Sequence, residues 1–260
     1  MNLSLKIIPL ELLEAYKNVF NDAVNHSFEN LHDSNLSVAD FSFYTSVSAV
    51  FSSKIEGEDI ELDSYIKHRA LGVQYQPDYT RKIDDLYNAY EFAKRNTLSA
   101  GNIMQAHIYL TKNILHPSQQ GQNRKGNMFV MTNDGKIEYV AAGPEKVDTE
   151  MDKFYSDLNV LLKAELSFSE ILFFASMLHL VFVKIHPLND GNGRTARLLE
   201  KWFIAEKLGS KAWFIESERN YYDYHQTYYN NIRKLGLEYD QLDYSQALPF
   251  LLMLPSSIKN

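Results

Sequence analysis

A short stretch of the chain, residues 186–197, combines the side chains that a phosphate-transfer reaction needs. Its order is His186-Pro187-Leu188-Asn189-Asp190-Gly191-Asn192-Gly193-Arg194-Thr195-Ala196-Arg197. His186 titrates near neutral pH and can take a proton from an attacking hydroxyl. Asp190 offers a hard oxygen ligand of the kind that Mg²⁺ prefers when it bridges two phosphates. A base, a metal carboxylate, a glycine turn and two arginines together predict phosphoryl or nucleotidyl transfer.

Helical patterns flank this stretch on both sides. The apolar segment before it, residues 171–185, opens with a capping-box pattern of Ser167 and Glu170. The segment after it continues to residue 208, and Gly209 is a suitable C-cap. We therefore expect a short loop between two helices, with its Gly-Asn-Gly end opening the second helix.

That arrangement predicts an anion site. Free N–H groups at a helix N-terminus point outward, and the helix dipole favours negative charge. Gly191 and Gly193 would let phosphate oxygens approach the backbone on either side of Asn192. Arg194 and Arg197 are three residues apart, so their guanidinium groups lie on one side of the first turns.

The combined pattern resembles the Fic family signature, His-Pro-Phe-x-Asp/Glu-Gly-Asn-Gly-Arg-x-x-Arg. Leu188 replaces the phenylalanine, and we expect this apolar side chain to pack into the core. The resemblance implies that His186 is the general base for a Ser, Thr or Tyr hydroxyl of a target protein and that Asp190 holds Mg²⁺. It also implies a phosphate-binding set of Gly191, Asn192, Gly193, Arg194 and Arg197, with Arg197 at the γ-phosphate.

A second stretch becomes informative beside this signature. A Ser four residues before a Glu is by itself usually a solvated helix end. Ser52, Glu56 and Gly57 nevertheless match the inhibitory motif Ser/Thr-x-x-x-Glu-Gly/Asn of Fic proteins. In family members that carry the motif, the Glu pairs with the second arginine, which is Arg197 here, and blocks productive ATP binding. The match implies the subclass with an N-terminal inhibitory helix. Some such enzymes also remove AMP, and that reaction stays open.

The periodicity changes from helical to strand-like between residues 121 and 140. Two apolar segments, 128–131 and 137–140, flank a turn with Asp-Gly at residues 132–136, which predicts a β-hairpin. An isolated hairpin is usually a surface excursion. The resemblance implies that Arg124 to Val140 is the Fic flap, which clamps the target segment by strand-type pairing.

Other aromatic and histidine residues have less specific interpretations. Aromatic residues at helical spacing are more often core than ligand contacts. The Fic resemblance implies that Tyr228 and Tyr229 lie near the adenine. His107 and His116 could suggest a metal site, but core or surface positions are the simpler interpretation without a matched carboxylate.

Composition limits the classes of protein. The chain has 260 residues, a net charge of −7 and no cysteine, which excludes disulfides and cysteine-bound zinc. No basic stretch stands out, so we expect no nucleic-acid partner. The longest apolar run contains His179 and Lys184 and is too short to span a bilayer. We expect a soluble, cytoplasmic protein without a secretory signal or a membrane partner.

The expected fold is all-α, a Fic-type helical bundle with one β-hairpin flap. We divide it into an N-terminal helical region at 1–97, whose inhibitory helix spans about 38–57, a Fic catalytic core at 98–232 and a C-terminal helical extension at 233–260. Helices are expected at 10–31, 38–55, 59–68, 79–97, after Ser99, at 148–162, at 171–185, after residue 191 and at 243–254.

The resemblance implies a Mg²⁺-dependent protein adenylyltransferase that uses ATP, modifies a target protein or itself, and is autoinhibited by Glu56. Two alternatives remain. One is transfer of UMP, phosphocholine or phosphate on the same scaffold, although Gly191-Asn192-Gly193 differs from the Ala-Asn-Lys of kinase-like relatives. The other is a non-catalytic ATP sensor, which would need neither His186 nor Asp190. The target and the oligomeric state stay open, a homodimer included.

Overall fold

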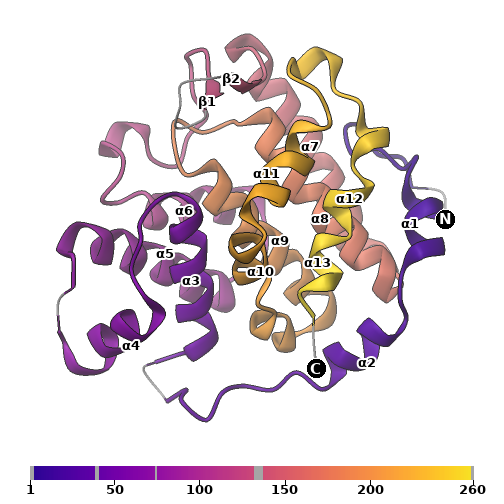
Figure 1. Cartoon of the computed structure of the whole chain (residues 1–260). Helices are drawn as coiled ribbons and strands as arrows, with labels where there is room; N and C mark the ends of the chain where they lie inside the picture. The colour runs from indigo at the N-terminus through magenta and orange to yellow at the C-terminus, as the bar shows by residue number, and fades with distance from the viewer. Residues whose placement is uncertain (1–2, 39–40, 74, 132–136, 259–260) are drawn as a thin grey trace.

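The computed structural model describes residues 3–38, 41–73, 75–131 and 137–258. Helices dominate this part of the chain, and its sheet is a two-stranded antiparallel hairpin, which confirms the predicted all-α fold with one hairpin (Figure 1). The elements are α1 Leu13–Val19, α2 Ala23–Glu29, α3 Phe43–Ile55, α4 Leu62–Leu71, α5 Pro77–Arg95, α6 Ala100–Leu110, β1 Phe129–Met131, β2 Ile137–Val140, α7 Pro144–Lys163, α8 Phe168–Ile185, α9 Asn192–Leu208, α10 Ser217–Asp223, α11 His225–Arg233, α12 Leu248–Leu251 and α13 Met253–Ser256.

Helix α8 is the centre of the fold. It begins at the predicted capping box, in which Ser167 Oγ accepts from Glu170 N and the Glu170 carboxylate accepts from Ser167 N. Every residue from 170 to 185 is buried. The surrounding helices are α1, α7, α9, α12 and α13 (Figure 1). By length and composition α8 could cross a membrane, but 89% of it is buried inside the protein, so core packing accounts for its apolar character.

Helix α3 brings a second segment against α9. Ser42 caps its N-terminus by accepting from Thr45 N, and α3 packs on α4, α5, α9 and α10. Its buried face carries small side chains, which let neighbouring helices approach closely. These are Ser46, Ser48, Ser52 and Ser53. The helix ends with Glu56 as C-cap and Gly57 at φ 94°, a conformation that favours glycine.

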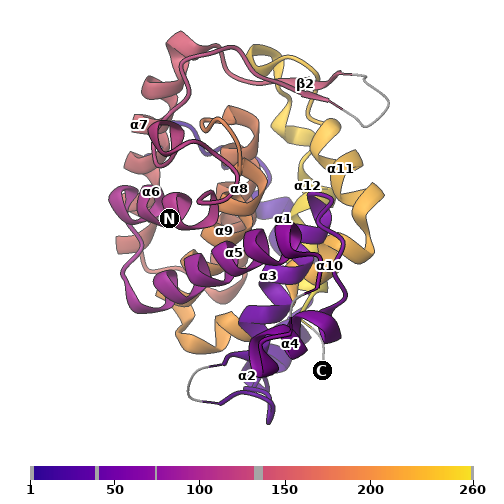
Figure 2. The same ribbon diagram turned by 90° about the vertical axis from the view of Figure 1, so that its left-hand side faces the viewer.

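The hairpin lies at one end of the molecule, opposite α2 and α4 (Figures 1 and 2). Phe129 pairs with Val140 and Val130 with Tyr139, and the register shifts after Val130. The predicted turn at 132–136 lies outside the described residues. Arg124, before the hairpin, donates its backbone N–H to Pro187 O at 2.8 Å, which joins this region to the loop after α8.

Two predicted helices are discontinuous, and the helix predicted at 38–55 begins only at Phe43. The segment at 10–31 is two helices, α1 and α2, because Phe20 is extended and the Asn21 side chain accepts from Ala23 N to start a new helix. The segment at 243–254 is a 3-10 turn, Tyr244–Gln246, followed by α12 and α13, and Pro255 lies inside α13 rather than ending it. The apolar pattern in both segments reflected burial but not helix continuity.

Candidate active site

The predicted loop begins where α8 ends. His186 is the C-cap of α8 with φ 52° and ψ 57°, a left-handed conformation that is uncommon for residues other than glycine. Its backbone N–H donates to Phe182 O at 2.9 Å. Its carbonyl oxygen accepts from Arg124 Nε at 2.7 Å. These contacts fix the point at which the histidine leaves the helix.

Arg124 is a buried clamp that the sequence analysis did not identify as a site residue. Besides His186 O, its guanidinium donates to Gly126 O at 2.6 Å, Ile185 O at 3.3 Å and Ala142 O. All four acceptors are backbone carbonyls, two at the end of α8 and two on either side of the hairpin. A guanidinium has five N–H donors in a rigid plane and can bind several carbonyls at once. Arg124 therefore joins the base of the hairpin to the end of α8 through hydrogen bonds.

The His186 ring has a defined tautomer. Tyr139 Oη donates to Val183 O at 2.6 Å, so its oxygen is left to accept from His186 Nδ1 at 2.8 Å. Val183 O lies 3.2 Å from the same nitrogen. Nδ1 therefore carries the proton and Nε2 has a free lone pair. Burial lowers the pKa of His186 to about 4, so the ring is neutral at pH 7 and can accept a proton.

Side chains within and behind the loop hold its shape. Asn192 accepts from Leu188 N and donates to Leu188 O, both at 2.9 Å. Leu188 is fully buried, as expected. His107 on α6 donates from Nε2 to Asp190 O at 3.0 Å, while its Nδ1 accepts from Gly121 N at 2.8 Å. The Asn192 side chain thus holds the loop, and its backbone N–H remains available at the start of α9. His107 supports the loop from the core.

The N-terminus of α9 forms the expected anion-binding geometry. Gly191 is its N-cap at φ 74°, and no side chain caps the helix. The first helical bond runs from Thr195 N to Gly191 O, so the N–H groups of Asn192, Gly193 and Arg194 precede it. A Cβ atom at Gly191 would lie 2.8 Å from Leu110 Cδ1, so the loop needs glycine on that side as well.

The end of α3 contacts this N-terminus through Arg197. Arg197 Nη2 donates to Glu56 Oε1 at 2.6 Å and to Ser52 O at 3.0 Å, and its Nε donates to Ser52 Oγ at 2.8 Å. A Cβ atom on Gly193 would lie 2.6 Å from Glu56 Oε1. Burial opposes the charge of Glu56, but Arg197 and Arg194 outweigh it and lower the pKa of Glu56. Glu56 is therefore an ionised carboxylate lying at the anion site.

Arg194 has a different carboxylate partner, Glu58, which the sequence analysis missed. Arg194 Nη2 lies 2.8 and 2.9 Å from the two Glu58 oxygens, and both side chains are buried. Lys82 Nζ on α5 contacts the same carboxylate at 3.2 Å. A second acidic residue two positions after Glu56 was the available signal, but an acidic helix end is too common to be interpreted alone.

Tyr228, which the resemblance places near the adenine, is buried in the core. Its Oη lies 2.9 Å from His179 Nε2 and 3.4 Å from Arg197 Nη1. His179 Nδ1 continues this network to Glu200 Oε2 at 2.9 Å. Tyr228 thus lies beside Arg197, and its position near the adenine stays a prediction. Tyr229 is only partly buried, and its predicted role is unchanged.

Asp190 is exposed at the loop, and its Oδ1 accepts from Gly191 N at 2.5 Å. The described residues contain no group of three or more side chains that could hold a metal ion. Mg²⁺ commonly takes one or two protein carboxylates together with substrate phosphates. A single exposed carboxylate beside an anion site fits that requirement.

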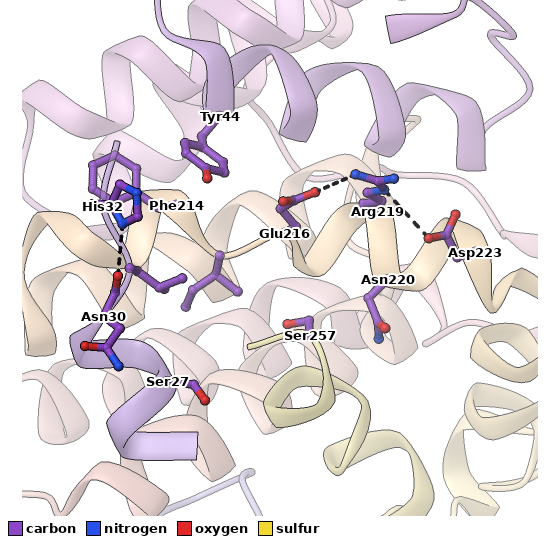
Figure 3. A pocket seen from close by; sticks show the side chains of 12 residues that line it. Ser27, Asn30, His32, Tyr44, Phe214, Glu216, Arg219, Asn220, Asp223 and Ser257 are labelled. Atoms are coloured by element: carbon purple, nitrogen blue, oxygen red, sulfur yellow. Dashed lines mark hydrogen bonds and ion pairs between the residues drawn. The ribbon is translucent and has the colours of Figure 1, made fainter. Parts of the chain in front are cut away.

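A cavity of about 590 Å³ lies away from these residues (Figure 3). Its lining includes Tyr44, Glu216, Arg219 and Asp223. Arg219 is paired with Glu216 at 3.1 Å and with Asp223 at 3.8 Å. The cavity shares no residue with the loop or with the two arginines of α9.

Comparison with known proteins finds one family that resembles the part of the chain holding the loop and the hairpin. Residues 97–204 match the family model of the Fic/DOC family. The matched region contains α6, the hairpin, α7, α8 and the loop that carries His186.

Curated relatives match part of the chain. One is a protein adenylyltransferase Fic of Nematostella vectensis, 30% identical over 112 residues, which are 43% of this chain and 24% of the relative. Another, of Aedes aegypti, bears the same name and is 30% identical over 139 residues, 53% of this chain and 26% of the relative. The chain thus spans about a quarter of the length of these relatives.

Solved structures share the fold over nearly the whole chain. A Fic family protein from Desulfovibrio desulfuricans has a TM-score of 0.74 at 18% identity, covering 98% of this chain and 74% of that one. Fic-1 of C. elegans has a TM-score of 0.65 at 17% identity, covering 95% and 68%. The N-terminal helices and the region that matches the family model therefore occur together in a known architecture.

Proposed function

We propose that the protein transfers AMP from ATP to a Ser, Thr or Tyr hydroxyl of a target protein, and that Glu56 restrains this reaction. One observation carries the proposal. The Glu56 carboxylate lies 2.6 Å from Arg197 Nη2, at the N-terminus of α9, where helix dipole and arginines favour an anion. A carboxylate in this position competes with a phosphate group for the same donors. The names of the curated relatives support AMP as the transferred group.

The described side chains provide a route for the chemistry. The target hydroxyl gives its proton to His186 Nε2 as its oxygen bonds to the α-phosphorus of ATP. The bond from that phosphorus to the β-phosphate oxygen breaks, and pyrophosphate leaves. Arg194, Arg197 and the N–H groups at the start of α9 would bind the phosphates. Asp190 would hold Mg²⁺, which neutralises phosphate charge.

The test follows two labels. Wild type, Glu56→Gly and His186→Ala are incubated with Mg²⁺ and ATP labelled at the α- or the γ-phosphate, with and without a host lysate. We expect label from α-ATP only, strongest with Glu56→Gly and absent with His186→Ala. His116→Ala, at an exposed histidine outside the site, is the matched control and should label as wild type does.

Other results point to other functions. Protein label from the γ-phosphate would identify a kinase and overturn AMP transfer. ATP binding without label in every variant would favour a nucleotide sensor or another donor. Equal labelling by wild type and Glu56→Gly would support AMP transfer but contradict the proposal that Glu56 restrains it.

A further inference from the structure

The contact between Arg194 and Glu58 has a geometry of its own. Both Glu58 oxygens lie within 2.9 Å of one nitrogen of Arg194, Nη2. The other two nitrogens, Nε and Nη1, are buried and have no hydrogen-bond partner among the described residues. A buried guanidinium with unpaired N–H groups is costly, so such groups are expected to have a ligand.

Glu58 does not lie where a competing anion would lie. Its side chain is 5% exposed, whereas that of Glu56 is 28% exposed and contacts Gly193 at the start of α9. Glu58 also shares its single negative charge between Arg194 and Lys82, so this group of three keeps a net positive charge. The pair of Glu56 and Arg197 is neutral by comparison.

Arg194 itself lies on the first turn of α9, at the anion site. Arg194 is three residues before Arg197 on α9, and both arginines act on the charge of the Glu56 carboxylate. An anion that replaces that carboxylate would therefore lie in the field of Arg194 as well. Because Glu58 occupies only Nη2, it leaves Nε and Nη1 for such an anion.

We propose that Glu58 is a positioning residue that holds Arg194 so that its Nε and Nη1 groups bind a phosphate of the nucleotide once Glu56 is displaced. The proposal rests on the function proposed above. Glu56 and Glu58 then have opposite effects, although they lie two residues apart. Glu56 competes with a phosphate for the site, whereas Glu58 positions an arginine that binds the phosphate.

The roles of Glu56 and Glu58 can be distinguished by whether removing each carboxylate raises or lowers the affinity for ATP. A second restraining carboxylate would weaken ATP binding through repulsion, and its removal would raise the affinity. A positioning carboxylate would do the reverse. Removing Glu58 frees the long Arg194 side chain to adopt other rotamers, and ordering it again opposes phosphate binding.

The experiment measures binding without turnover. Glu56→Gly/His186→Ala is the reference, and Glu58→Gln is added to it. Affinities for ATP and for adenosine are measured by calorimetry with Mg²⁺ present. We expect Glu58→Gln to weaken ATP binding by about 10-fold and to leave adenosine binding unchanged, because adenosine has no phosphate. Asp59→Asn, at an exposed neighbour, is the matched control and should change neither affinity.

A double-mutant cycle tests whether Glu58 acts through Arg194. Arg194→Ala should weaken ATP binding at least as much as Glu58→Gln, and combining the two should add nothing further. Tighter ATP binding in Glu58→Gln, an equal loss for ATP and adenosine, or additive losses would each overturn the proposal. Absence of ATP binding by the reference itself would overturn the proposed function and this inference with it.

Discussion

The two sides of the active site are held by different kinds of partner. On the base side, His186 and its loop are held by Tyr139, Val183 and Arg124, whose bonds to them run through a hydroxyl and backbone carbonyls. On the phosphate side, Arg194 and Arg197 are held by the carboxylates of Glu58 and Glu56. The first set adds no negative charge, and its one cation, Arg124, donates to neutral backbone carbonyls. The second set adds charge where the substrate would bring its own.

The difference means that the catalytic histidine is fixed in place, while the phosphate site beside it holds a carboxylate. The base side has its tautomer, ring orientation and backbone fixed before substrate binds, which is typical of a preorganised catalytic group. The phosphate side is equally ordered, but one of its two carboxylates lies in the anion site. Under the proposed restraint by Glu56, only the end of α3 needs to move, because the remaining geometry is already in place.

The largest effect should come from the base side. In the Glu56→Gly background, we expect His186→Ala to lower the rate of AMP transfer by about 10²- to 10⁴-fold, the usual contribution of a general base. ATP affinity should stay within about 2-fold, since the ring contacts no phosphate-binding group. Single-turnover transfer and calorimetry measure the two quantities.

A parallel loss of ATP affinity in His186→Ala would contradict this separation of the two sides. His116→Ala controls for the loss of any imidazole, and an unchanged melting temperature would show that the fold is intact.

Removing the Glu56 carboxylate from the phosphate side should have the next largest effect on the rate of transfer. We expect Glu56→Gly to raise the rate of transfer by about 5- to 150-fold, the range of typical coupling energies between a regulatory contact and a ligand. The reason is that Arg197 and the N–H groups at Gly193 lose a competing anion. The rate is measured at saturating target, and ATP affinity is measured in parallel.

Glu56→Gln is the informative companion variant. It keeps the size of the side chain and removes its charge, so it should give a smaller increase of the same sign. An unchanged rate in both variants would show that Glu56 is structural.

A smaller effect should follow when the clamp behind the base is weakened. Arg124→Lys keeps the positive charge but loses the fork that binds backbone carbonyls at the end of α8 and beside the hairpin. We expect kcat to fall by about 10-fold through displacement of His186, with little change in KM for ATP. The free energy of unfolding should fall by about 2–4 kcal/mol, because buried carbonyls lose donors.

Arg95→Lys, at an exposed arginine on α5, is the control for the substitution itself. A rise in KM with kcat unchanged would mean that Arg124 acts on the nucleotide and not on the base.

The extent to which the sequence predicted this site follows from where its parts lie along the chain. The loop and the start of α9 are contiguous, so the types and spacing of residues 186–197 were sufficient to place them. Glu56 was found because it has a short pattern of its own. The hairpin was visible through its change of period, and its pairing is confirmed.

The residues that hold the site could not be predicted in the same way. Arg124, Tyr139, His107 and Glu58 come from separate elements, and their roles depend on which side of each element faces the loop. Tyr228 is buried beside Arg197, as aromatic residues at helical spacing often are, and its position near the adenine stays a prediction. Periodicity reports that a residue is buried, but tertiary packing decides which partner it finds.

The smallest expected effect concerns pH and tests the base side alone. A histidine of ordinary pKa, about 6.5, would lose its function as base when the pH falls through that value. Burial lowers the pKa of His186 to about 4, so the neutral ring should persist well below pH 6.5. We expect kcat/KM of Glu56→Gly, which reports the free enzyme, to show no acid limb from His186 between pH 8 and about 5.5.

The lowered pKa of His186 also affects the stability of the fold. The folded state binds fewer protons than the unfolded state between pH 4 and 6.5, so acidification through this range should lower the free energy of unfolding. A rate that falls with a midpoint near pH 6.5, with a constant melting temperature, would show that the pKa of His186 is that of a solvent-exposed histidine. The tautomer fixed by Tyr139 would then no longer explain how the base is prepared.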